Sequence, residues 1–95
     1  MATSGTSTYD FLVHVPGEQG RWCKGGRLTL TNGIAYIRTP FSIVDVANAN
    51  LMSKPGVPTE AVIVDIYKES DAWWVRFVCG ARTGDVVCFT IWGRM

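Results

Sequence analysis

The dipeptide Asn32-Gly33, which separates two short apolar segments, constrains the fold of this chain more than any other feature. Both central residues of a two-residue type I′ turn need positive φ, and Asn-Gly adopts that conformation most readily. The pair therefore predicts a β-hairpin and sets its register, with Leu30 facing Ala35. The buried face of this hairpin would hold Leu28, Leu30, Ala35 and Ile37.

The same register places Arg27 directly opposite Arg38 on the other face of the hairpin. Like charges in this position repel, and an anion or a nearby carboxylate usually relieves the repulsion. The two arginines are therefore a candidate anion site. The alternative is two solvated side chains that point apart, because exposed charges interact weakly.

Alternating apolar residues between turn signals predict about six strands. Their expected ranges are 9–15, 26–31, 34–39, 61–68, 73–80 and 86–92. The fold class expected from this pattern is mostly β, a small antiparallel barrel or sandwich of SH3-like or OB-like type.

Residues 41–51 fit two different elements. Ser42 with Asp45 three positions later has the form of a capping box, which predicts one short helix near 42–50. The β-branched residues of the segment suit a strand equally well. We favour the helix, which would indicate an OB-like order, whereas a strand here would indicate a sandwich.

Length and composition limit the organisation and the function classes. We expect a flexible Ser/Thr/Gly-rich tail over 1–8 and a single β domain over 9–95. A net charge of +1 excludes a protein that holds duplex nucleic acid by charge alone. No apolar run reaches the roughly 18 residues of a membrane span. Three cysteines are too few for a disulfide framework, and their number is odd, so we expect a reducing, cytoplasmic setting.

A second hairpin is expected to join 61–68 to 73–80 through Glu69–Ala72. Its register puts Asp65 opposite Arg76 and Tyr67 opposite Trp74. A three-residue loop, Arg82-Thr83-Gly84, would then add 86–92 beside 73–80, because glycine suits the left-handed position of such a loop. Cys79 would lie in the core and Cys88 on the reverse side.

The predicted three-stranded sheet has an apolar face and a reverse face with Tyr67, Trp74 and Trp92 in a row. Arg76 and Asp65 lie one pleat along. Flat rings beside a guanidinium suit the stacking of a nucleobase, a sugar ring or a proline-rich peptide. The alternative is that these rings are covered, by 41–51 or by another copy, since large exposed aromatic patches are rare.

Residues 20–27 form the one basic stretch of the chain. A Gly-rich backbone carries Arg21, Trp22, Lys24 and Arg27, which with Arg38 make a candidate anion-binding set for phosphate or an acidic protein surface. The competing interpretation is a solvated loop whose Trp22 caps the end of the barrel.

Catalysis has little support in the sequence. Cys23 could pair with His14 as nucleophile and base, but nothing in their spacing fixes the distance between them, and no third orienting group is identifiable. There is no C-x-x-C and no His/Cys spacing typical of zinc, so we expect no metal and no cofactor.

The function expected is a non-catalytic binding module that acts through the aromatic sheet face, in protein–protein interaction or self-assembly. The alternative is single-stranded nucleic-acid binding by that face together with the local basic patch. A Cys23-based enzyme is a third hypothesis, and it requires an unusually reactive thiol.

Overall fold

The computed structural model of the 95-residue chain describes residues 7–51, 62–80 and 84–95. All of the regular structure in these ranges is β-strand. The strands are β1 (Ser7–His14), β2 (Arg21–Thr29), β3 (Ile34–Arg38), β4 (Ile43–Leu51), β5 (Ile63–Glu69), β6 (Ala72–Val78) and β7 (Val86–Arg94). No helix in the described part of the chain is long and apolar enough to cross a bilayer.

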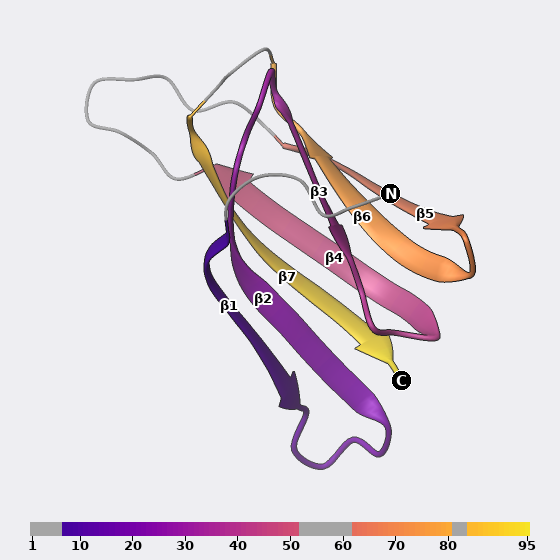
Figure 1. Cartoon of the computed structure of the whole chain (residues 1–95). Helices are drawn as coiled ribbons and strands as arrows, with labels where there is room; N and C mark the ends of the chain where they lie inside the picture. The colour runs from indigo at the N-terminus through magenta and orange to yellow at the C-terminus, as the bar shows by residue number, and fades with distance from the viewer. Residues whose placement is uncertain (1–6, 52–61, 81–83) are drawn as a thin grey trace.

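The strands form two antiparallel sheets (Figure 1). One has four strands in the order β1-β2-β7-β4, and the other has three in the order β3-β6-β5. The two sheets pack face to face and do not close into a barrel, so the described part of the chain is a sandwich with four edge strands. The expected class of a small antiparallel β fold is confirmed, with seven strands rather than about six.

The core lies between the sheets and follows from the period of two in each strand. Val75 and Phe77 of β6 face Phe89 and Ile91 of β7, and all four are at most 4% exposed. The rings of Phe77 and Phe89 lie 5.4 Å apart between centroids. Predicted core residues of the first hairpin are also buried, namely Leu28, Leu30, Ala35 and Ile37.

The Asn32-Gly33 turn is as predicted. Its φ angles are 53° and 81°, and Thr31 and Ile34 exchange two backbone hydrogen bonds of 3.0 and 3.1 Å. Beyond that bridge the chain leaves the hairpin register, because β2 pairs with β1 and β7 while β3 pairs with β6. The turn is thus a corner between the two sheets rather than the end of a long ribbon.

This corner overturns the expected pairing of Arg27 with Arg38. Arg27 is opposite Cys88 in the four-stranded sheet, and Arg38 is opposite Trp74 in the three-stranded sheet. The physical reason is burial: two strands in one ribbon would leave their apolar face uncovered, whereas splitting them lets the two halves of that face cover each other.

The predicted short helix near 42–50 is wrong, since Ile43–Leu51 is strand β4. It pairs with β7 over its length, with a bulge between Val44 and Val46. The β-branched residues and a free edge of β7 outweigh a capping-box pattern that spans only one helical turn. As expected for a strand at this position, the fold is a sandwich.

The prediction that 86–92 lies beside 73–80 in one sheet is also wrong. Gly84 does have the expected positive φ of 89°, but β7 pairs with β2 and β4 and crosses to the other sheet. Trp92 is therefore opposite Cys23 and Val46, not opposite Trp74. The alternation of β7 was read correctly, because its apolar side enters the same core from the facing layer.

Two boundaries differ from expectation at the N-terminal end. The stretch 20–27 is not a loop, since strand β2 begins at Arg21. Ser7 and Thr8, expected in the tail, begin strand β1. The rest of the expected tail, residues 1–6, lies outside the described residues.

Truncation of the aromatic contact between the sheets should be costly. We expect Phe77→Ala to lower the free energy of unfolding by about 3–5 kcal/mol, because it removes a fully buried ring and leaves a cavity. Ile63→Ala, at a side chain that is 61% exposed, should cost less than about 1 kcal/mol. Urea unfolding followed by tryptophan fluorescence measures both, and similar losses would contradict the sandwich core.

Candidate functional site

The β5–β6 hairpin positions the residues of the strongest candidate site. Its turn residues Ser70 and Asp71 have φ of 52° and 61°, which makes a tight two-residue connection. The register is the predicted one, with Asp65 opposite Arg76 and Tyr67 opposite Trp74. Because Val75 and Phe77 enter the core, these four side chains lie on the outer face of the three-stranded sheet.

A hydrogen-bonded ion pair dominates this outer face. Arg76 Nη2 and Nε both donate to Asp65 Oδ2, at 2.6 and 3.2 Å. The hydrogen bond to Asp65 raises the pKa of the Arg76 guanidinium. The same guanidinium carbon is 5.9 Å from the centre of the Tyr67 ring, within cation–π range.

The predicted row of three rings is only partly present. Trp74 is 2% exposed, although its side chain leaves the outer face of the central strand β6. The ring beside it is Tyr36 from β3, edge-to-face at 6.2 Å, and not Trp92. Tyr36 was not identified as a site residue from the sequence. The Asn32-Gly33 turn nevertheless indicates that Tyr36 lies on the face of the hairpin away from Ala35 and Ile37.

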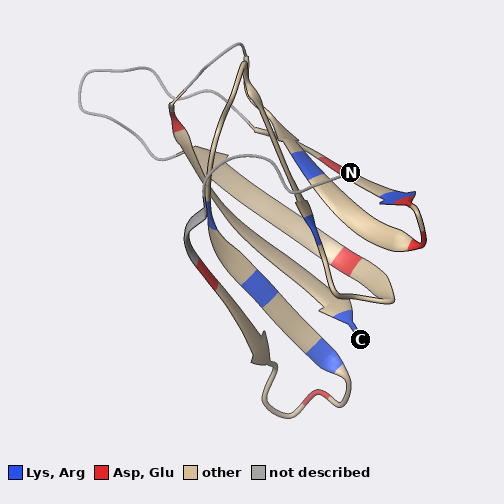
Figure 2. Ribbon diagram, viewed as in Figure 1, with Lys and Arg blue, Asp and Glu red and all other residues tan. Residues whose placement is uncertain are grey.

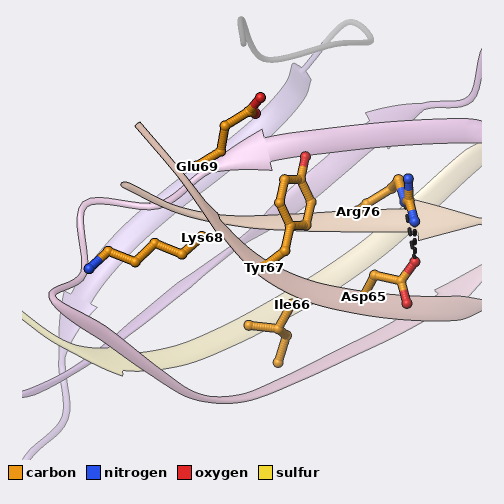
Figure 3. A pocket seen from close by; sticks show the side chains of 6 residues that line it. All are labelled: Asp65, Ile66, Tyr67, Lys68, Glu69 and Arg76. Atoms are coloured by element: carbon orange, nitrogen blue, oxygen red, sulfur yellow. Dashed lines mark hydrogen bonds and ion pairs between the residues drawn. The ribbon is translucent and has the colours of Figure 1, made fainter. Parts of the chain in front are cut away.

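A hollow of about 480 Å³ lies along the β5–β6 hairpin (Figure 3). It is lined by Asp65, Ile66, Tyr67, Lys68, Glu69 and Arg76. Burial raises the pKa of the Tyr67 hydroxyl, as does the charge of Glu69, while Arg76 lowers it. Tyr67 therefore remains a neutral hydrogen-bonding phenol at the wall of the hollow.

Two polar atoms near this face are buried without a hydrogen-bond partner among the described residues. They are Glu69 Oε2 and Trp74 Nε1. An unmet buried polar group usually costs about 1–3 kcal/mol. A third such atom, Arg21 Nε, lies on the four-stranded sheet, so these groups are not confined to one face of the sandwich.

Lys and Arg residues lie on both sheets (Figure 2). Four residues of the candidate anion-binding set lie along strand β2, namely Arg21, Trp22, Lys24 and Arg27, and Arg38 lies on β3 in the other sheet. Lys24 and Arg38 line one hollow of about 540 Å³ at the open side between the sheets, with Leu12 and Phe41. Arg27 is on the outer face of the four-stranded sheet, opposite Cys88. The expected set is therefore brought together only in this one pair.

Trp22 and Arg21 have structural partners instead. Trp22 packs against the core and meets the ring of His14 edge-on at 5.1 Å. Arg21 contacts Glu18 at 3.2 Å and Asp45 at 3.6 Å.

Like-charge pairing does occur, but between other arginines than those predicted. Arg21 of β2 lies directly opposite Arg94 of β7. Asp45, which the β4 bulge turns toward them, contacts Arg21 Nε at 3.6 Å and Arg94 Nε at 3.5 Å. The carboxylate offsets the repulsion between the two guanidiniums.

Cys23 and His14 do not form a nucleophile–base pair. On the β1–β2 ladder Cys23 is opposite Val13, whereas His14 is opposite Trp22, so the two side chains leave opposite faces of the sheet. Cys23 is 5% exposed, and burial raises the pKa of its thiol. Within the described residues no group of three or more His, Cys, Asp or Glu is arranged to hold a metal ion.

Replacing the carboxylate between the two arginines should destabilise the fold in a salt-dependent way. We expect Asp45→Asn to lower the free energy of unfolding by about 1 kcal/mol at low salt, since Arg21 and Arg94 then face each other without the carboxylate between them. The loss should shrink in about 1 M salt because the repulsion is screened. Asp71→Asn, at a turn where Asn tolerates positive φ, is the matched control, and an equal effect there would contradict the assignment.

The cysteines should differ in reactivity. Cys23 should react with iodoacetamide several-fold more slowly than Cys88 near neutral pH, because its raised pKa lowers the thiolate fraction and its side chain is buried. The labelling rate of Cys23 should rise with pH until the pH exceeds the raised pKa of its thiol. Mass spectrometry of partially labelled protein measures this, and fast labelling of Cys23 would revive the enzyme hypothesis.

In comparisons with known proteins, no family model matches the chain, and neither the curated proteins nor the solved structures include a significant match.

Proposed function

We propose that this chain is a non-catalytic binding module that contacts another protein through the outer face of the β3-β6-β5 sheet. The observation that carries the proposal is the Asp65–Arg76 ion pair beside Tyr67. Its two charged side chains are 42% and 47% exposed and yet joined at 2.6 Å. A charged, ordered and accessible group of this kind suits recognition rather than core packing.

The residue types support a protein partner. Tyrosine and arginine are enriched among the residues that contribute most to protein interfaces. Here Trp74 packs behind the surface, and Asp65 holds Arg76, so the partner would not have to order these side chains on binding. The adjoining hollow of about 480 Å³ falls within the roughly 300–1,000 Å³ usual for ligand pockets.

Single-stranded nucleic-acid binding is the competing function, and the distribution of charge favours it less. Base stacking needs an exposed ring next to unpaired cations. Trp74 is buried, Arg76 is paired with Asp65, and Arg21 is paired with Glu18.

A cytoplasmic location is part of the proposed binding function, since all three cysteines are free thiols.

Selection from a displayed random-peptide library on the full chain tests the proposal. We expect peptides whose binding Tyr67→Ser and Arg76→Ala each weaken about tenfold or more, since such residues act as hot spots. Thr90→Ala, on the outer face of the other sheet, should leave their affinity unchanged. Circular dichroism confirms that each variant is folded.

Two outcomes would contradict the proposal. One is a selection that yields no binder, or binders indifferent to Tyr67→Ser. The other is salt-dependent quenching of tryptophan fluorescence by oligothymidylate, which would favour the nucleic-acid function instead.

A further inference from the structure

Strand β1 is an edge of the four-stranded sheet, and it is the least protected of the four edges. Within the described residues its backbone pairs with β2 alone. Its ladder with β2 is regular from Tyr9 to His14. The middle of this run is Phe11-Leu12-Val13, with no lysine, arginine or proline, and such an edge readily pairs with another strand.

The other three edges carry the features that usually block such pairing. Strand β4 contains a bulge between Val44 and Val46. Strand β3 has only five residues and is soon followed by Pro40. Strand β5 carries three charged side chains, Asp65, Lys68 and Glu69. Short, bulged and charged edges are the common means by which sheets avoid edge contact. Strand β1 has a register shift of its own between Ser7 and Tyr9, so its uninterrupted edge is the run from Tyr9 to His14.

Both faces of β1 expose apolar side chains. Leu12 is 39% exposed and Val13, on the other face, is 48% exposed. Leu12 also lines the hollow of about 540 Å³ at the open side between the sheets, where Arg38 and Ala72 of the three-stranded sheet form the facing wall. A further strand beside β1 would thus meet apolar groups on both faces and open space next to Leu12.

We infer that the occupant of this edge is a second copy of the chain, whose β1 pairs antiparallel with the first around a two-fold axis at Leu12. The two four-stranded sheets would then form one continuous sheet of eight strands. The inference concerns a surface separate from the β3-β6-β5 face and does not depend on its proposed role.

Self-complementarity of the β1 sequence selects this register. A two-fold axis perpendicular to the sheet requires one residue to face its own copy. With Leu12 on the axis, Asp10 faces His14 of the second copy, and Phe11 faces Val13 of the second copy. An imidazole N–H can donate to the opposing carboxylate, and this pair occurs twice by symmetry.

Neighbouring registers lack this match. With residue 10 on the axis, two Asp10 carboxylates repel each other; with residue 11 on the axis, Asp10 faces Leu12; and with residue 13 on the axis, His14 faces Leu12. Pro16, which has no N–H to donate, limits the ladder at its far end. The pairing of charged and apolar side chains therefore favours the register with Leu12 on the axis.

The oligomeric state of the full chain is the first test. Sedimentation equilibrium should show a mass that rises with concentration from the 10.5 kDa of one chain toward twice that value. A single-chain mass up to about 1 mM would overturn the inference. It would leave the peptide-binding proposal untouched, because that is measured at another surface.

A charge exchange tests the register. His14→Asp places carboxylates opposite each other at two points, and we expect it to raise the dimer dissociation constant about tenfold. Asp10→Lys combined with His14→Asp restores opposite charges and should restore the dimer. Asn50→Asp, on the far edge strand β4, adds the same charge as a control and should have no effect. Failure of the double variant to recover, while it remains folded, would contradict the register.

Cross-linking gives an independent readout. In a Cys88→Ser background, Leu12→Cys should form a disulfide-linked dimer under mild oxidation, because residue 12 faces its own copy. Asp10→Cys should not, since its neighbour across the axis is residue 14. Equal cross-linking of both variants would overturn the proposed register.

Discussion

The structure depends on the mutual cover of two apolar sheet faces. Neither sheet has a helix to bury its inner side within the described residues, so each must bury it against the other. Phe77 and Phe89, one from each layer, meet at 5.4 Å in the middle of this contact. The change of partner at the Asn32-Gly33 corner serves the same requirement, because β2 and β3 enter facing sheets and Leu30 and Ala35 beside the corner are both buried.

Electrostatics adjusts this framework locally. Packing places Arg21 and Arg94 opposite each other, and a bulge in β4 supplies Asp45 between them. On the opposite layer Asp65 and Arg76 make a pair that has no such structural conflict to resolve. One cluster offsets a cost that the fold imposes, and the other is free to serve in recognition, which is why the outer face of the three-stranded sheet is the candidate site.

The candidate site was predictable where it rests on a single hairpin. The register of β5 with β6 follows from local turn chemistry, so Asp65, Arg76 and Tyr67 were found from the sequence. Trp92 was assigned wrongly because its place depends on which sheet β7 joins, a choice made by contacts distant in the chain. Tyr36 was overlooked for the same reason, since β3 becomes a neighbour of β6 only through the corner at residues 32 and 33.

What the sequence by itself determined is the local geometry: positive φ at Asn32, Gly33 and Gly84, the alternation of the strands on either side of these turns, and the inward direction of Leu28, Leu30, Ala35 and Ile37. These are properties of a few adjacent residues, and sterics and hydrophobic burial suffice to set them. Only the tertiary structure decided how the strands divide between two sheets and that residues 43–51 form a strand. The physical reason is that a strand can bury its apolar side chains beside a partner in the same sheet or against a strand across the core. Which of these partners is available depends on the whole chain.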